Sequence, residues 1–473
     1  MKKILLILLA LTISLFAEVN MVKNSVVKIF SAISFPDYKY PYQTSKISEF
    51  SGSGAIISNN RILTSAHVVS GARFIEIQKE DDPKKYIASV KYISHQVDLA
   101  ILEVNDKDFF IDTNPLKLSE DIKTREEVTV LGYPLGGNTI STTTGIISRI
   151  EYLNYVWSGF YLLAVQIDAA INNGNSGGPV LNVNNELVGI AMMRLTKTSN
   201  IAYIVPSIII NTFLEDVKDG IVNGFHSDSV VIQELNNISQ KTLYGLDDRN
   251  GVLITYVGID ENLLKVDDIL LEIDNKDIAN NGTVKTKYGR VDFNMQFHTK
   301  QLSESVKLKI LRNNEKMTIN YPLKKVVPLI NMEFGKEPRY IIYGGFIFTP
   351  LTRNYLNSLY SSSNGLDMLF YQKDKTVDYQ EPIVSLKTIF PSEVNRGYYA
   401  ASYILIKVNN IKIKNFNHLV SVLDNMTDEY TIFEFLEKTK VVLKTKDAKN
   451  SLIAIKKIYN LKDDRRLQSK NLQ

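Results

Sequence analysis

Three short stretches of this 473-residue sequence carry side chains that could act together in acyl transfer. Ser176 lies in "GNSGGP", His67 in "TSAHVV" and Asp98 in "VDLAIL". Acyl transfer at neutral pH needs an activated nucleophile, a base that takes its proton, and a third group that orients the base. Histidine suits the base because its pKa lies near neutrality, and a carboxylate entering an apolar strand needs a hydrogen-bond partner. These residues therefore predict a serine nucleophile, a histidine base and an orienting aspartate.

The turn around Ser176 has a composition that favours an unusual backbone path. Its glycines cost conformational entropy, which is worthwhile only where the turn has a demanding shape. The N–H groups of Gly174 and Ser176 could converge on the oxygen that becomes negative when a carbonyl is attacked. We therefore expect Gly174 and Ser176 to form an oxyanion hole. The chain order His67, Asp98, Ser176 is that of chymotrypsin-type barrels, and it differs from the order in subtilisin and α/β-hydrolase folds.

Short strands must position these residues. In residues 22–205, short strand-like runs, either apolar throughout or alternating apolar and polar, are separated by turn signals. One example, "GAIISNNRILTSAHVV", predicts a strand, an Asn59-Asn60 turn and a second strand. Many short strands at regular spacing favour a barrel or a sandwich. The stretch "PSIIINTFLEDVKDG" then predicts a helix that ends at Gly220.

The sequence after residue 221 contains a weak internal repeat. "ILLEIDNKDI" (269–278) aligns with "ILIKVNNIKI" (404–413), and each predicts a strand, a tight turn, a return strand and then a helical stretch. Two copies of one module are the natural interpretation. The last residues, 461–473, are polar, and we expect them to be disordered.

The composition excludes several classes of chemistry. The sequence has no cysteine, which excludes disulfides, thiol nucleophiles and cysteine-ligated zinc. The histidines show no metal-ligand spacing, and no phosphate-loop signature is present, so we expect neither a metal nor another cofactor. A net charge of +4 without a dense basic stripe gives no reason to expect nucleic acid as a partner.

The N-terminal segment resembles a secretory signal peptide. Lys2 and Lys3 precede the apolar run "ILLILLALTISLF", and Ala17 offers a cleavage point. This pattern predicts export to a bacterial periplasm. The alternative is an uncleaved segment that anchors the protein in the inner membrane.

Several motifs together resemble the HtrA/Deg family of serine proteases. They are "SGSGAIIS", "TSAHVV", "VDLAIL", "LGYPLGG", "DAAINNGNSGGPV" and "IAYIVPS". Two others, "GYPLGGNTISTTTGIISRIEY" and "RYIIYGGFIFTPLTRNYL", resemble the plant-type Deg subgroup, which has two PDZ domains. Asn173 departs from the family pattern, which has Pro before the glycine of "GNSGG".

The resemblance implies a mainly β protein in which a chymotrypsin-like double β-barrel protease domain precedes two PDZ-like domains. The implied organisation is a signal peptide at 1–17, a trypsin-like protease domain at 18–220, a PDZ domain at 221–328, a divergent PDZ-like domain at 329–460 and a polar tail at 461–473. It also implies that His67, Asp98 and Ser176 form the triad. Trimers, or multiples of trimers, are the implied assembly.

The resemblance also places a substrate pocket. In this fold the base of the primary pocket lies six residues before the nucleophile, at Ala170, and the strand after the nucleophile supplies Ala191, Met192 and Met193 as walls. These residues carry no charge, so we predict cleavage after apolar residues of unfolded or damaged proteins. Peptide-bond hydrolysis would need no ATP and would pass through an acyl-enzyme intermediate.

Two alternatives remain open at the level of sequence. The chain could be a chaperone or a PDZ scaffold whose triad is idle. It could also process one specific partner, which the sequence does not distinguish from general degradation.

Overall fold

The structure is a computed structural model, and it describes residues 22–43, 46–155, 157–194, 201–227, 230–246, 248–258, 261–359, 380–398, 403–436 and 438–469. It divides into two compact units. The first comprises the chain to Ile33 together with Glu49–Val326, and the second comprises Ser34–Ser48 together with the chain from Val327. The predicted signal peptide lies outside the described residues. No helix among the described residues has the length and apolar character needed to cross a membrane.

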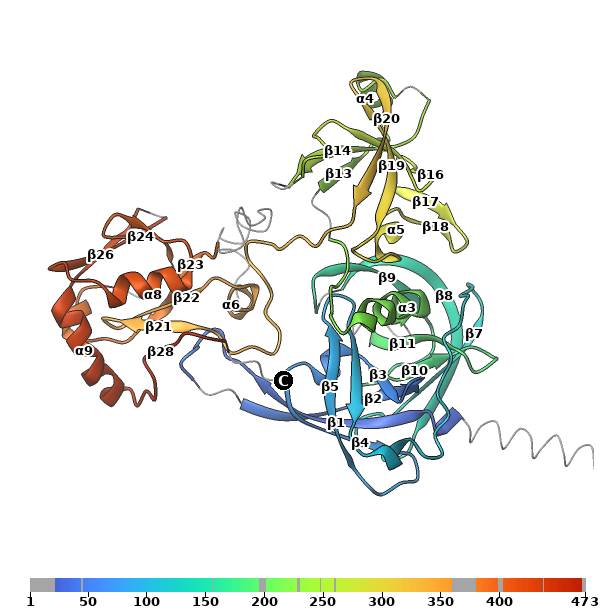
Figure 1. Ribbon diagram of the computed structural model, residues 1–473, viewed down its shortest axis with the longest axis horizontal. Helices are drawn as coiled ribbons and strands as arrows, with labels where there is room; N and C mark the ends of the chain where they lie inside the picture. The colour runs from blue at the N-terminus through green and yellow to red at the C-terminus, as the bar shows by residue number, and fades with distance from the viewer. Residues whose placement is uncertain are drawn as a thin grey trace, which may run out of the picture. The chain divides into compact units, whose positions relative to one another are not determined.

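Twelve strands form two closed antiparallel barrels in the first unit, as the sequence predicts (Figure 1). The first barrel has the order β1-β2-β3-β6-β5-β4, from strands β1 (Val26–Phe35), β2 (Lys46–Ile57), β3 (Arg61–Thr64), β4 (Ala72–Lys79), β5 (Tyr86–Ser94) and β6 (Leu99–Val104). The second has the order β10-β11-β12-β9-β8-β7, from strands β7 (Glu127–Gly132), β8 (Ser141–Tyr155), β9 (Phe160–Ile167), β10 (Pro179–Leu181), β11 (Leu187–Arg194) and β12 (Ala202–Pro206).

The local turns follow the sequence signals. Asn59 and Asn60 both have positive φ, 66° and 52°, in the turn between β2 and β3, a conformation that asparagine tolerates better than most residues. Short helices complete this region: α2 (Ala66–Val69), η1 (Lys107–Phe110), α3 (Ser207–Asp216) and η2 (Val217–Asp219). The predicted helix after β12 is therefore present: α3 ends at Asp216, and the 3-10 helix η2 continues it to Gly220, whose φ is +90°.

A further sheet follows in the first unit. It has the order β13-β14-β15-β19-β20, with β16 paired to β15, and a separate hairpin joins β17 and β18. Their bounds are β13 (Val230–Glu234), β14 (Val252–Val257), β15 (Ile269–Ile273), β16 (Lys276–Asp277), β17 (Thr283–Thr286), β18 (Gly289–Asp292), β19 (Ser305–Arg312) and β20 (Glu315–Pro322), with helices α4 (Ile238–Leu243) and α5 (Met295–His298).

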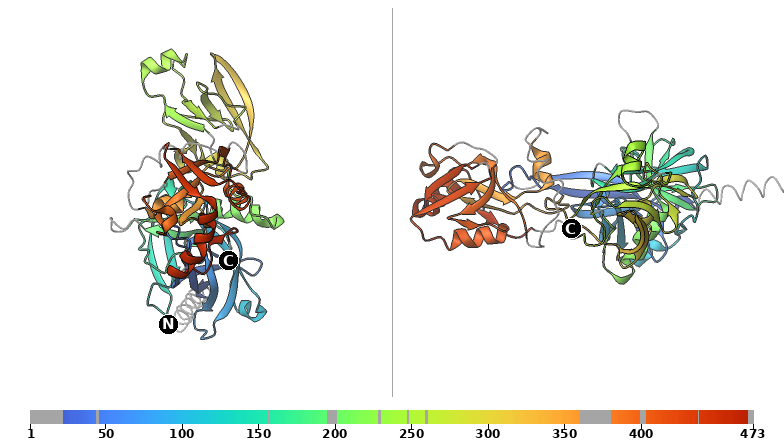
Figure 2. Two further views of the ribbon diagram at one scale, coloured as in Figure 1. Left: turned by 90° about the vertical axis from the view of Figure 1, so that its left-hand side faces the viewer. Right: turned by 90° about the horizontal axis from the view of Figure 1, so that it is seen from above.

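The second unit is built on one long sheet of order β27-β26-β24-β23-β22-β21-β28, with β25 paired to β24. The strands are β21 (Tyr340–Tyr343), β22 (Phe346–Pro350), β23 (Ile383–Ile389), β24 (Tyr403–Val408), β25 (Ile411–Lys412), β26 (Tyr430–Phe435), β27 (Lys440–Lys444) and β28 (Arg465–Arg466). The helices are α6 (Arg353–Ser358), η3 (Glu393–Asn395), α8 (Phe416–Asp424) and α9 (Thr445–Ile458). Figure 2 shows the ribbon of the chain from two further sides.

The internal repeat corresponds to one hairpin that occurs in both units. Asp274 and Asn275 turn from β15 into β16, and Asn409 and Asn410 turn from β24 into β25, all four with positive φ. The second copy is followed by helix α8, as predicted. The first copy is instead followed by the hairpin β17–β18, because Gly282 and Gly289, both with positive φ, flank a short alternating run there.

The expectation of a disordered tail is wrong for the part that the structure describes. Arg465 and Arg466 pair with the edge of β21. Arg466 also stacks over the Tyr340 ring and contacts the Glu337 carboxylate at 3.2 Å. A polar segment is ordered here because an open strand edge and an aromatic face satisfy its backbone and its guanidinium groups.

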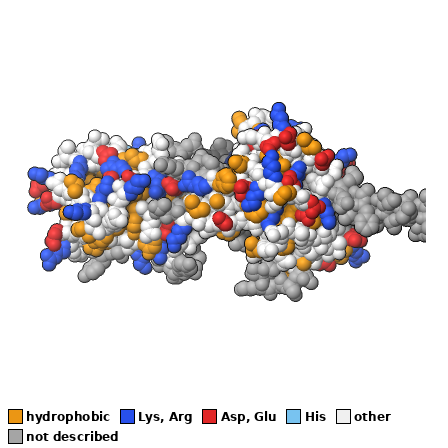
Figure 3. Space-filling view, turned by 90° about the horizontal axis from the view of Figure 1, so that it is seen from below, with side chains coloured by type: hydrophobic (Ala, Val, Ile, Leu, Met, Phe, Trp, Pro, Cys, Tyr) orange, Lys and Arg blue, Asp and Glu red, His pale blue; other side chains and the backbone are white. Residues whose placement is uncertain are grey.

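Acidic and basic side chains are interspersed on the face drawn in Figure 3. This mixture accords with the nearly balanced net charge of +4.

Candidate active site

Asp98 binds both the ring and the backbone of His67. It lies just before β6, is fully buried, and has a φ of 57°. Its Oδ2 lies 2.7 Å from His67 Nδ1, and its Oδ1 accepts the backbone N–H of His67 at 2.8 Å. The Asp98 carbonyl also accepts the N–H of Ala66 at 3.0 Å. One residue therefore caps the start of α2 and orients the imidazole that α2 carries.

The charge of Asp98 changes the acidity of His67. Burial lowers the pKa of His67, but the negative charge of Asp98 and the hydrogen bond to it raise that pKa more, so the net shift is upward from 6.5. The His67 side chain keeps 26% of its surface exposed, whereas that of Asp98 is fully buried. A partly accessible imidazole held by a buried carboxylate is suited to accept a proton from a neighbouring hydroxyl.

A third side chain reaches Asp98 from the second barrel. The Tyr155 hydroxyl, at the end of β8, donates to Asp98 Oδ2 at 2.8 Å. Tyr155 was not predicted from the sequence. The only signal was its position near the end of a strand, in a stretch where Tyr152, Tyr155 and Tyr161 stand close together.

The backbone around Gly174 follows the demanding path expected from its sequence. Gly174 has a φ of +100°, and a Cβ built there would lie 2.3 Å from the Tyr133 carbonyl oxygen. Leu135 N–H donates to the Asn173 carbonyl at 2.8 Å, which turns that carbonyl toward residue 135. Among the described residues, neither the Gly174 nor the Ser176 amide donates to a protein acceptor.

Ser176 lies beside the segment that leads into α2. Ser53 N–H donates to the Ser176 carbonyl at 2.9 Å. The next residue, Gly177, is so close to this segment that an added Cβ would lie 2.1 Å from Thr64 Oγ1. The structure therefore brings the turn around Ser176 to the start of the helix that carries His67. Within the described part of the chain, no hydrogen bond joins the Ser176 hydroxyl to His67.

Ser53 ties two loops together behind this turn, and it too was missed from sequence. Its buried hydroxyl donates to the Gly174 carbonyl at 2.8 Å and accepts the Tyr133 N–H at 2.8 Å. The "SGSG" stretch that contains it gave the only available signal, because a small polar residue between glycines permits close approach of another backbone.

The four predicted pocket residues differ in exposure. Ala170 is exposed and Met193 is half-buried, whereas Ala191 and Met192 are buried. Ala191 pairs with the turn around Ser176, since its N–H donates to the Gly178 carbonyl and its carbonyl accepts the Gly177 N–H. Met192 packs into the large apolar core. Among the described residues, no group of three His, Asp or Glu side chains could hold a metal ion.

The double barrel places the chain in the class of serine endopeptidases with a trypsin-like domain, and comparison with known proteins agrees. Residues 52–190 match the trypsin-like peptidase domain, and residues 328–467 match the PDZ domain.

The most similar relatives include three Arabidopsis thaliana proteins. Putative protease Do-like 3, mitochondrial, is 35% identical over 90% of this chain and 76% of its own length. Protease Do-like 4, mitochondrial, is 33% identical over 94% and 85%. Protease Do-like 2, chloroplastic, is 32% identical over 93% and 74%. The chain therefore belongs to the HtrA/Do-like family of serine proteases, as its motifs indicated.

A solved structure supports the fold. The HtrA-type protease AlgW with tripeptide has a TM-score of 0.51 and 22% identity, over 64% of this chain and 95% of that chain. The expected periplasmic localisation is wrong, because it conflicts with relatives that are named mitochondrial or chloroplastic. An apolar N-terminal run preceded by lysines thus did not identify the compartment.

Proposed function

We propose that this serine endopeptidase cleaves unfolded or damaged proteins through Ser176, His67 and Asp98. The 2.7 Å contact between His67 Nδ1 and Asp98 Oδ2 supports this proposal most strongly. It assigns the proton to Nδ1 and leaves Nε2 as the base. The tie between Ser53 and Ser176 supports it further, because it holds the nucleophile turn next to α2.

The reaction proceeds in two halves. His67 Nε2 takes the Ser176 hydroxyl proton while Oγ attacks the scissile carbonyl carbon, and the N–H groups of Gly174 and Ser176 receive the developing oxyanion. His67 then gives its proton to the leaving amine, and an acyl-enzyme forms. Water, activated by the same imidazole, hydrolyses the ester and restores Ser176.

Substitution of the nucleophile tests the proposal. In degradation of β-casein, Ser176→Ala is expected to reduce the rate by about 10⁴-fold or more. Ser89→Ala, an exposed serine on β5, is the matched control and should keep the wild-type rate. Equal degradation by wild type and Ser176→Ala would contradict the triad and would favour the alternative of a chaperone or scaffold with an idle site.

Specificity and assembly are part of the same proposal. An uncharged pocket would be formed by Ala170, Ala191, Met192 and Met193, so we expect cleavage after Val, Ala, Leu or Met. A peptide panel cut mainly after Lys or Arg would contradict this.

We also propose that residues 221–328 act as a first PDZ domain and that the protein assembles as trimers or multiples of trimers. Light scattering, with and without a denatured substrate, measures that assembly.

A further inference from the structure

The carboxylate of Asp98 accepts three hydrogen bonds, and one of them comes from outside the predicted triad. His67 N–H binds Oδ1, while His67 Nδ1 and the Tyr155 hydroxyl both contact Oδ2, at 2.7 Å and 2.8 Å. Asp98 belongs to the first barrel and Tyr155 to the second. The hydrogen bond from Tyr155 therefore bridges the two barrels at the buried carboxylate.

Packing holds the Tyr155 ring in place. The residue is 4% exposed and lies in the same apolar core cluster as Val97 and Leu99, the neighbours of Asp98. Its carbonyl accepts the Gly159 N–H at 2.6 Å, which closes the turn between β8 and β9. A buried aromatic ring on a paired strand has few conformations, so its hydroxyl can fix the partner that it contacts.

The phenol acts as a hydrogen-bond donor throughout the working pH range. Burial, the charge of Asp98 and the hydrogen bond to it all raise the pKa of Tyr155 above its ordinary value of 10. The hydroxyl therefore keeps its proton, and a carboxylate oxygen can only accept.

We infer that Tyr155 is a positioning residue of the proposed catalytic site, whose phenol holds Asp98 Oδ2 against the ring of His67. This inference rests on the proposed function. The hydrogen bond has a second effect, because a donor that stabilises the carboxylate weakens its attraction for the imidazolium. Tyr155 thus both orients Asp98 and keeps His67 from being protonated at too high a pH.

Among the described residues, the titratable groups beside this contact are His67, Asp98 and, through Trp157, His95. His67 and Asp98 touch it directly. Trp157, which does not titrate, lies 6.2 Å from Tyr155 between ring centroids and also packs against His67 and His95, at 6.3 Å and 5.5 Å. His95 is therefore the other imidazole whose titration could alter the pH profile. To exclude it, Tyr155→Phe is measured both alone and in a His95→Gln background, and a shift that is the same in both is assigned to His67.

Tyr155→Phe tests the inference, since it removes the hydroxyl and keeps the ring. We expect kcat to fall by about 10-fold with KM little changed, and the acid limb of kcat/KM to move upward by about half a pH unit or more. Tyr161→Phe is the matched control, because Tyr161 lies on the same hairpin, is 54% exposed and stacks on Tyr152. It should keep the wild-type kcat and pH profile.

The outcomes distinguish this inference from the proposed function. If wild-type activity survives Ser176→Ala, the proposed function fails. If activity depends on Ser176 but Tyr155→Phe keeps the wild-type kcat and acid limb, only the role of Tyr155 is overturned. A fall in activity without movement of the acid limb would also overturn it, because loss of packing alone predicts that result. As a second measure, Tyr155→Phe should have much less effect when Asp98→Asn is already present.

Discussion

At the scale of single residues, the proposed pair of His67 and Asp98 should determine how activity depends on pH. The pKa of His67 is raised above 6.5, so the acid limb of kcat/KM should have its midpoint above that value. Asp98→Asn should move the midpoint down and lower kcat by about 10³- to 10⁴-fold. A pH–rate profile of both proteins measures this, and an acid limb below pH 6 in the wild type would contradict it.

The same raised pKa has a consequence for folding. Protonated His67 is favoured in the folded state, so its contribution to the free energy of unfolding is fully present below the unfolded pKa of about 6.5. The contribution is lost as pH rises through the higher folded pKa. Proton uptake at His67 therefore stabilises the fold while it removes the proposed catalytic base.

Sequence reasoning predicted the contact of His67 with Asp98, because each lies in a short motif of distinctive composition. It did not predict Tyr155. The stretch "EYLNYVW" offers two tyrosine hydroxyls three residues apart, on opposite faces of a strand, and only the closure of the second barrel decides which one turns inward toward a carboxylate from the first.

At the scale of elements, the turn before Ser176 depends on a glycine. Gly174→Ala should abolish most activity, because its φ of +100° and the 2.3 Å approach of a Cβ to the Tyr133 carbonyl both oppose a side chain. Gly136→Ala is the control. It has a φ of +82° but nothing within 4 Å of an added Cβ, so only a backbone cost of about 1–2 kcal/mol is expected. Equal activity of the two variants would contradict this account of the turn.

Ser53 gives a second prediction at this scale. Ser53→Ala leaves the Tyr133 N–H and the Gly174 carbonyl without their buried partner, so the free energy of unfolding should fall by about 1–3 kcal/mol. Denaturant unfolding against the exposed control Ser89→Ala measures the loss. A difference below about 0.5 kcal/mol would show that the hydroxyl does not hold the two loops.

The elements themselves were largely predictable. Asx and glycine turn signals marked the β2–β3 turn, the two repeat hairpins and the end of α3. The C-terminal strand β28 was not, because "DDRR" has no strand pattern and is ordered only by the open edge of β21 and the ring of Tyr340.

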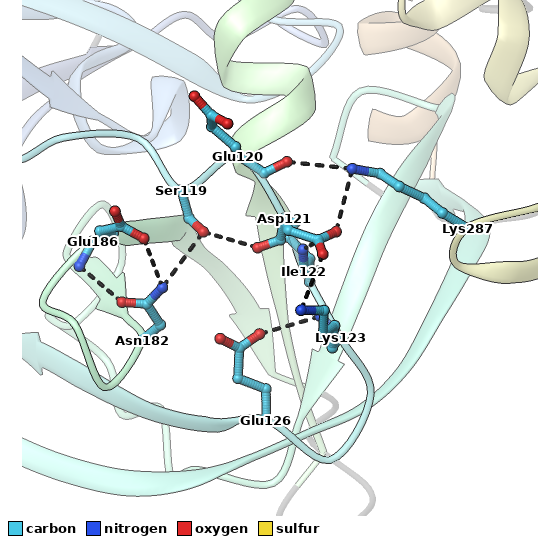
Figure 4. A network of polar contacts seen from close by, with 9 residues as sticks. All are labelled: Ser119, Glu120, Asp121, Ile122, Lys123, Glu126, Asn182, Glu186 and Lys287. Atoms are coloured by element: carbon cyan, nitrogen blue, oxygen red, sulfur yellow. Dashed lines mark hydrogen bonds and ion pairs between the residues drawn. The ribbon is translucent and has the colours of Figure 1, made fainter.

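At the scale of the whole first unit, the hairpin β17–β18 and helix α5 contact the double-barrel region in two ways. Lys287 reaches Asp121 at 3.2 Å and the Glu120 carbonyl at 3.3 Å, at the edge of a polar network (Figure 4). Val291 and Met295 instead belong to the main apolar core together with barrel residues. An exposed ion pair contributes little, whereas a buried apolar side chain contributes much.

These two contacts should respond differently to truncation. Met295→Ala should lower the free energy of unfolding by about 2–5 kcal/mol, because the residue is 4% exposed. Lys287→Ala should cost less than about 1 kcal/mol, since both partners are about half exposed. Denaturant unfolding of the two variants checks the order, and a larger loss from Lys287→Ala would reverse the account of this interface.

Which segments of the chain make up each unit could be predicted only in part from the sequence. The repeat located the two later modules, but nothing in residues 34–48 indicates that they pack with residues from 327 onward. That contact depends on long-range partners: the Tyr38 hydroxyl donates to the Lys336 carbonyl, and the Tyr42 ring packs on Phe390.

The most direct test of the central claim is covalent labelling with a fluorophosphonate, followed by peptide mass mapping. If Ser176 is the activated nucleophile, its Oγ displaces fluoride, and one phosphonyl group per chain is found on the peptide that contains Ser176. His67→Ala should prevent the labelling although the serine is still present. Labelling of another serine in a protein that remains fully active, or equal labelling after removal of His67, would contradict the account.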